Sequence, residues 1–173
     1  MSSVRDAQQL DKLVDAAKAI ALHHASITPR LAALTDLLWG AYAPLGCSWI
    51  GFYVPSVEGG EDALILSCCK PKPACSPIGM HGVCGQSFRE GVIRIVEDVA
   101  LLGAAYVACD PRDRSEIVVP IFVDGLPAGV LDLDSQAPAC FTDADASALT
   151  RILASAGLLD RRVNSRSDKL PTR

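Results

Sequence analysis

The chain has 173 residues and a formal net charge of −4, and half of its residues are apolar. This is enough for one domain with a full hydrophobic core, but the acidic balance lacks the basic patch that nucleic-acid binding requires. No apolar run approaches the roughly 20 residues of a membrane span. Charges near the N-terminus also interrupt the apolar core that a signal peptide needs. We therefore expect a cytoplasmic protein that binds neither nucleic acid nor membrane.

Two helices are predicted within residues 6–44. Apolar residues recur every three or four positions from Leu10 to Ala21, which is the spacing of one buried helix face. Thr28 and Pro29 then stand where the cap and the first residue of a second helix are expected. That helix continues through a leucine-rich segment.

Strands dominate residues 47–135, where the irregular stretches 70–91 and 100–114 interrupt them. Runs rich in β-branched and aromatic residues predict strands at 48–54, 63–69, 92–99, 115–123 and 128–135. Asp-Gly between the last two predicts a hairpin turn. Long irregular connections in compact domains are usually functional, so the two interruptions are candidate site loops.

A C-terminal helix is predicted over 142–160, with Thr142 as its cap. Helices at both ends of a run of strands predict an α+β fold with a central, mainly antiparallel sheet. We expect a single domain over residues 1–163 and a disordered tail at 164–173.

Three acidic residues are predicted to meet on one face of this sheet. Asp132 and Asp134 are two positions apart in one strand, so their side chains share a face. Glu116 opens the other strand of the hairpin and can join them. Clustered carboxylates repel one another, so the pKa of at least one should be raised. That carboxyl group would keep its proton at a higher pH than usual and could donate it to a leaving oxygen. The alternative is an ordinary solvated strand face.

Two aromatic residues of the first strand, Trp49 and Tyr53, also share one face. They either pack against the rest of the domain or form a wall for a small apolar or sulfur-bearing group. The alternation by itself leaves both interpretations open.

The chain has seven cysteines, which should be reduced in the cytosol. Their spacing lacks the paired pattern of a zinc site. Four lie in or beside apolar runs and are expected to be buried and inert: Cys47, Cys68, Cys69 and Cys140. Cys75, Cys84 and Cys109 lie in the irregular stretches, where we expect exposure. Arg112 and Arg114 should favour the thiolate of Cys109, and three loop thiols beside acids indicate a thiol redox cycle.

Together these motifs resemble one family, the free methionine-(R)-sulfoxide reductases, which are built on a GAF domain. The matching segments, in family order, include WIGFY (49–53), KPAC (72–75), GVCG (82–85), ACD (108–110), SEIVVP (115–120) and LDLDS (131–135). The resemblance implies an α+β GAF domain with a sheet of about six strands and the N- and C-terminal helices on one face. The chain departs from the family pattern at SCCKP (67–71) and at Tyr106, where the family usually has histidine.

The resemblance also implies a reaction, the reduction of free L-methionine-(R)-sulfoxide to methionine. Cys109 would attack the substrate sulfur and remain as a sulfenic acid. Cys75 would condense with it to a disulfide, and Cys84 would be a further redox cysteine. A thioredoxin-type dithiol would reset the enzyme. The resemblance implies no bound cofactor and no metal. It also implies a homodimer, as is usual in the family.

The same resemblance assigns roles to the acids and the aromatic residues. Glu116, Asp132 and Asp134 would polarise the sulfoxide and hold the amino group of the substrate. Trp49 and Tyr53 would form the wall around its methyl-sulfur end. A second hypothesis is a non-catalytic GAF module that binds a small ligand or senses redox state.

Overall fold

A seven-stranded sheet in the order β3-β2-β1-β6-β5-β4-β7 forms the centre of the protein. The computed structural model describes residues 6–56, 62–105, 109–161 and 163–167. The strands are β1 Cys47–Ser56, β2 Ala63–Lys70, β3 Ile78–Gly79, β4 Ile93–Val96, β5 Ser115–Val123, β6 Leu126–Ser135 and β7 Ser165–Ser167. Every neighbouring pair is antiparallel except β4 and β7. The predicted α+β class with a mainly antiparallel sheet is confirmed.

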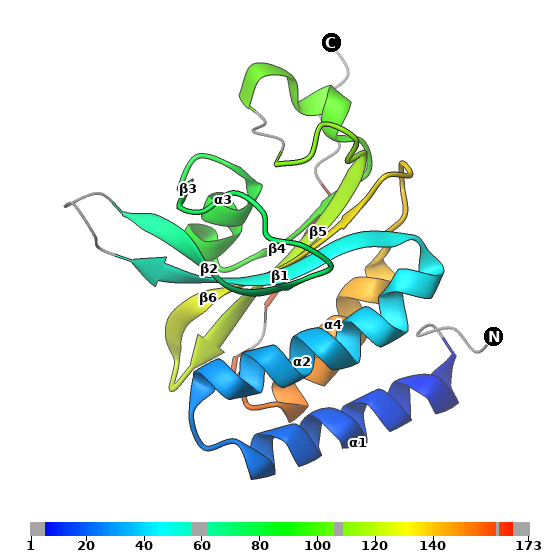
Figure 1. Ribbon diagram of the computed structural model, residues 1–173, viewed down its shortest axis with the longest axis vertical. Helices are drawn as coiled ribbons and strands as arrows, with labels where there is room; N and C mark the ends of the chain where they lie inside the picture. The colour runs from blue at the N-terminus through cyan, green and yellow to red at the C-terminus, as the bar shows by residue number, and fades with distance from the viewer. Residues whose placement is uncertain (1–5, 57–61, 106–108, 162, 168–173) are drawn as a thin grey trace.

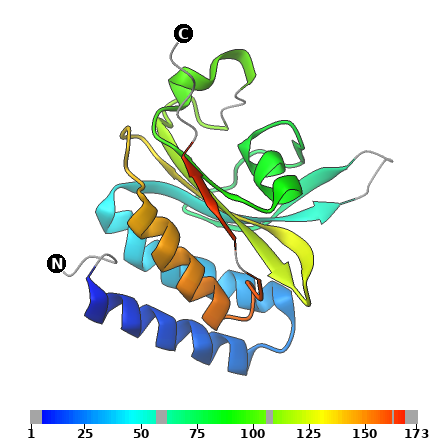
Figure 2. The same cartoon turned by 180° about the vertical axis from the view of Figure 1, so that it is seen from behind.

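The helices cover the two faces of the sheet unequally (Figures 1 and 2). Three of them, α1 Ala7–His23, α2 Ile27–Tyr42 and α4 Asp143–Ser155, lie together on one face, as predicted. The short α3 Val83–Glu90 lies on the opposite face, against β5 and β6. Within the described part of the chain, none of the helices is long and apolar enough to cross a membrane.

Two predictions about the helix ends had different outcomes. The cap predicted at Thr28 is wrong, because the helix α2 begins at Ile27 after the extended residue Ser26. Thr142 does cap α4, since its backbone N–H donates to Asp145 Oδ2 at 2.8 Å in a capping box.

The alternation of side chains along β1 divides the interior into two clusters. Ile50 and Phe52 are fully buried in the larger cluster, between the sheet and the three long helices. Trp49 and Tyr53 point to the opposite face, where they belong to a smaller cluster with Cys84. The second cluster therefore fills the face on which the three acids are expected.

The β5–β6 hairpin has the predicted two-residue turn. Asp124 and Gly125 both have positive φ, at 53° and 75°, which is the conformation that suits a tight hairpin with right-handed strand twist. The register then shifts by one residue between Ile121 and Phe122, and beyond this bulge Glu116 lies directly opposite Asp134. The turn and the bulge together therefore fix which acids meet on the sheet.

The stretch 70–91 is more ordered than its sequence indicated, because it contains β3 and α3. An added Cβ at Gly85 would lie 2.3 Å from Met80 Cα, so the helix packs closely on the segment before it. Gly91 ends α3 in the left-handed conformation that terminates many helices. In the stretch 100–114, the 3₁₀ helix η3 covers Val99–Ala105.

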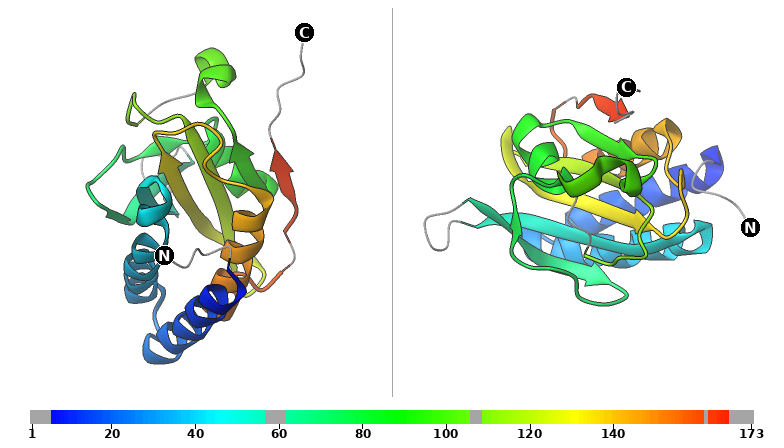
Figure 3. Two further views of the ribbon diagram at one scale, coloured as in Figure 1. Left: turned by 90° about the vertical axis from the view of Figure 1, so that its right-hand side faces the viewer. Right: turned by 90° about the horizontal axis from the view of Figure 1, so that it is seen from above.

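The predicted disordered tail also contains structure. Residues Ser165–Ser167 form β7, which pairs in parallel with β4 and lies at the edge of the sheet (Figure 3). Backbone pairing of β4, which would otherwise be an edge strand, explains this order. Residues 168–173 lie outside the described part of the chain.

Candidate functional site

Three buried carboxyl groups meet on the sheet face that α3 covers. Glu116, Asp132 and Asp134 expose only 4%, 7% and 8% of their surfaces. One oxygen of each lies within 4.8 Å of the others. The group could surround one small cation, whether a metal ion or an ammonium group. The sheet register therefore brings together the three acids that the sequence singled out.

Burial makes these carboxyl groups reluctant to ionise. It raises the pKa of Asp132 to about 7, although the Cys84 thiol donates to Asp132 Oδ2 at 3.2 Å and opposes this rise. Burial, together with the charges of Asp132 and Glu116, raises the pKa of Asp134 well above its usual range. Asp132 Oδ1 has no hydrogen-bond partner among the described residues. The cluster thus combines a proton donor with an acceptor awaiting a ligand.

A cavity of about 250 Å³, the carboxylate cavity, opens above the three acids. Besides the acids, its lining includes Tyr53 from β1, Val83 and Cys84 from α3, and Cys75 and Cys109 from the two site loops. Strand, helix and loops thus converge on a space of the size that a small metabolite occupies.

Cys109 and Cys75 lie beside each other at this cavity, with both thiols free. Although much of Cys109 is exposed, its thiol lies against Cys75. This local burial and the neighbouring thiol raise the pKa of Cys109 to about 12. The two cysteines are therefore placed to react with each other, but the resting site holds the Cys109 proton.

The prediction that two arginines favour the Cys109 thiolate is wrong. Arg112 binds Asp110 at 2.7 Å, and Arg114 binds Asp98 at 2.7 Å. Their charges are largely engaged by these carboxylates, which leaves burial as the dominant effect on the pKa of Cys109.

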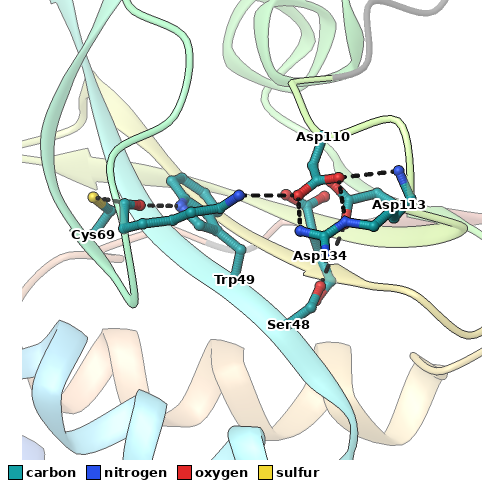
Figure 4. Close-up of polar contacts among 8 residues, drawn as sticks. Ser48, Trp49, Cys69, Asp110, Asp113 and Asp134 are labelled. Carbon is teal, nitrogen blue, oxygen red and sulfur yellow. Dashed lines mark hydrogen bonds and ion pairs between the residues drawn. The ribbon is translucent and has the colours of Figure 1, made fainter.

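Trp49 and Tyr53 both hold the loop that carries Cys75. The Trp49 indole N–H donates to the Lys72 carbonyl at 2.8 Å, and the Cys69 thiol donates to the same oxygen at 3.3 Å (Figure 4). The Tyr53 hydroxyl donates to the Cys75 carbonyl at 3.0 Å. Tyr53 lines the carboxylate cavity, whereas Trp49 lines a second cavity next to it.

The third loop cysteine, Cys84, is buried, and the expectation that it is exposed is wrong. It lies in the first turn of α3 and faces Asp132, because the helix packs on the sheet. Burial and the nearby acids raise the pKa of its thiol. Cys84 is therefore part of the wall of the site in this conformation.

Of the four cysteines expected to be buried, Cys47 alone is fully so, with its thiol donating to the Trp49 carbonyl at 3.0 Å. The other three, Cys68, Cys69 and Cys140, are half-buried. Cys68 lies 3.2 Å from the Thr35 hydroxyl. The apolar neighbours of these three cysteines in the sequence therefore led to an expectation of more burial than the structure shows.

Sequence reasoning missed Asp113, a buried acid beside the cluster. It accepts a hydrogen bond from the Ser48 hydroxyl at 3.3 Å (Figure 4), and burial raises its pKa. It also missed the ion pair between Lys72 and Asp110, at 3.1 Å, which joins the two site loops. Acid–base alternation in DPRDR was the available signal. Tyr106 lies outside the described residues.

The architecture is that of a small α+β domain in which a curved sheet and a short helix enclose a carboxylate-lined cavity flanked by thiols. The chain matches the GAF domain family over residues 31–159 and belongs to that family. It is 37% identical over 109 residues to the free methionine-R-sulfoxide reductase of Escherichia coli, covering 62% of each chain. It is 41% identical over 106 residues to protein YtsP of Bacillus subtilis, covering 60% of this chain and 63% of the relative. The chain thus spans somewhat less than two thirds of these relatives.

Solved structures extend the similarity over more of the chain. The free methionine-R-sulfoxide reductase from Neisseria meningitidis, in complex with its substrate, is 31% identical with a TM-score of 0.76 and covers 86% of each chain. The reduced form of the corresponding enzyme from Staphylococcus aureus is 32% identical with a TM-score of 0.75, covering 86% of this chain and 92% of that one.

Proposed function

We propose that this protein reduces free L-methionine-(R)-sulfoxide to methionine. The observation that carries the proposal is the convergence of Cys109, Cys75 and the buried carboxyl groups on one cavity. In the net reaction, one sulfoxide and two thiols give methionine, one disulfide and water. The similarity to reductases from two solved structures supports this substrate over other small ligands.

The carboxylate cavity offers a place for both polar ends of the substrate. Its ammonium group would lie among the three carboxyl groups and would give Asp132 Oδ1 the partner that it lacks. The protonated acid of the cluster would donate to the sulfoxide oxygen as general acid. Tyr53, with Trp49 behind it, would pack against the methyl-sulfur end; the two ring centroids are 6.0 Å apart.

Ligand binding would also activate the nucleophile. The charge of Asp132 contributes to the raised pKa of Cys109, and an ammonium group beside Asp132 would offset that charge. Cys109 would then attack the substrate sulfur as a thiolate and be left as a sulfenic acid when methionine departs. Cys75 would condense with the sulfenic acid, releasing water.

The recovery of the enzyme completes the proposal. Thioredoxin or a similar dithiol would reduce the disulfide in the cytoplasm, with no bound cofactor. Cys84 would enter as a further redox cysteine only if α3 moves, because its thiol is buried against Asp132. We expect a homodimer, which light scattering during size-exclusion chromatography would test.

The decisive experiment supplies the racemic free sulfoxide and a thiol reductant, and follows both epimers and methionine by chromatography. We expect loss of the R epimer alone, and none with Cys109→Ser. Persistence of the R epimer, or its undiminished loss in that variant, would contradict the proposal. Thiol titration separates the alternative of a ligand-binding or sensing module, because the enzyme should lose two thiols per sulfoxide and a binder none.

A further inference from the structure

A second cavity, of about 310 Å³, also opens on Cys109, and we propose that the thiolate of the reductant reaches Cys109 through it. This loop cavity is lined by residues on both site loops and at the end of β6, among them Lys72, Pro73, Ala74, Asp110, Arg112 and Gln136. Cys109 lines both cavities, whereas Cys75 lines the carboxylate cavity only. The inference rests on the proposed function, because it places the second half of that reaction.

The charges of the two cavities favour different molecules. Four acidic side chains line the carboxylate cavity, and its only basic side chain among the described residues is His81. The loop cavity is lined by three acids, Asp110, Asp113 and Asp134, but also by two cations, Lys72 and Arg112, with 59% and 63% of their side chains exposed. Both cations contact Asp110, which offsets part of their charge. A thiolate therefore meets exposed cations at the loop cavity, whereas the carboxylate cavity has four acids and no lysine or arginine among its described lining residues.

The chemistry of disulfide exchange points to the same side. The attacking sulfur must approach in line with the bond that breaks, opposite the leaving sulfur. If Cys75 leaves, the attacker on Cys109 comes from the side that Cys75 does not occupy. The loop cavity reaches Cys109 without contacting Cys75. Substrate and reductant therefore reach one sulfur from two different cavities.

The step balances with two thiols of the reductant. A thiolate attacks Cys109 Sγ, the Cys109–Cys75 bond breaks, and Cys75 leaves as a thiolate that takes up a proton. A second thiol then attacks the reductant sulfur of the mixed disulfide. This releases the oxidised reductant as a disulfide and returns Cys109 as a thiolate. The reductant supplies both electrons, whether it is a small thiol or the exposed cysteine of a dithiol protein.

The test isolates the reductive step from the sulfoxide. The Cys109–Cys75 disulfide is formed with diamide, verified by mass mapping, and reduced under stopped flow with 2-mercaptoethanol, glutathione or thioredoxin. Three variants are compared: Arg112→Gln, Gln136→Trp, and the control Arg114→Gln, whose arginine pairs with Asp98 and lines neither cavity. Methionine formed in one turnover without reductant is measured separately.

Removal of the cation at Arg112 should slow reduction by anionic glutathione about fivefold and by neutral 2-mercaptoethanol less than twofold. Filling the loop cavity with Gln136→Trp should slow both small thiols about tenfold or more, and the control should match the parent. If Gln136→Trp also slows reduction by thioredoxin, the attacking cysteine of a dithiol protein uses the loop cavity as well.

Parental reduction rates in both loop-cavity variants would overturn the inference. So would an equal loss of the single-turnover burst and of the reduction rate, which would mean that both molecules use one cavity. Failure of the proposed function gives a different result. No methionine would then form even in the parent, while reduction of the chemically formed disulfide could still be measured.

Discussion

Replacing Asp132 by asparagine should stabilise the fold at alkaline pH while removing activity. The folded protein keeps the Asp132 proton up to a pKa of about 7, whereas the unfolded chain releases it near 3.8. Between these values the folded state binds more protons, so the free energy of unfolding falls as pH rises and levels off above pH 7. Asparagine has no such titration. Its carbonyl can still accept from the Cys84 thiol, which now donates at 3.2 Å.

The magnitude follows from the width of the titration. From pH 5 to pH 7 the free energy of unfolding of the parent should fall by about 1.36 kcal/mol per pH unit. The parent should therefore lose on the order of 3 kcal/mol of stability that the variant retains. The pKa of Asp134 is raised partly by the charge of Asp132. The substitution therefore also reduces the cost of ionising Asp134, in the same direction.

Urea unfolding of reduced protein at pH 5 and pH 8 measures this difference. The exposed Asp15→Asn on α1 serves as the matched control and should follow the parent curve. Activity of Asp132→Asn should fall about a hundredfold, since a general acid contributes about that much or more. Parallel stability curves for the parent and Asp132→Asn would refute the burial argument, whatever the activity.

Three further predictions concern the neighbours of the site and one helix end. Cys75→Ala should lower the pKa of Cys109, because the adjacent thiol helps to hold the Cys109 proton. Alkylation of Cys109 by iodoacetamide, followed by mass spectrometry, should then be about fivefold faster, and an equal or slower rate would contradict this. In Gly51→Ala the new Cβ would lie 2.3 Å from the Trp49 indole, so we expect a shifted fluorescence maximum and a loss of about 1–3 kcal/mol; an unchanged spectrum and unfolding midpoint would contradict this. Thr142→Ala should cost about 1 kcal/mol by removing the capping box of α4, which thermal denaturation would detect; an unchanged midpoint would show that the cap contributes nothing.

The parts of the site that could be predicted follow from strand geometry. Alternation placed Asp132 and Asp134 on one face, and the Asp-Gly turn indicated that β5 pairs with β6, although the exact pairing of Glu116 with Asp134 also needs the one-residue shift between Ile121 and Phe122. Both rules are local, so a single sequence is enough to apply them. The mainly antiparallel sheet could be predicted for the same reason.

The parts that could not be predicted depend on contacts between distant segments. The helix α3 has eight residues, too few to be stable alone, and it forms because its apolar face packs on the sheet. That packing buries Cys84, which a loop would have exposed. Likewise, Arg114 pairs with Asp98, which is 16 positions away in the chain, and nearness in sequence to Cys109 did not indicate this partner.

The protons held by the buried acids make part of the negative charge of the protein conditional on its ligand. A count of −4 treats every aspartate and glutamate as ionised, yet burial raises the pKa of Asp134 well above its usual range and the pKa of Asp132 to about 7. A ligand cation that enters the cluster should drive some of these protons into the solvent, while one acid stays protonated as the proposed general acid. The observed binding enthalpy would then depend on the ionisation enthalpy of the buffer, and binding would acidify an unbuffered solution.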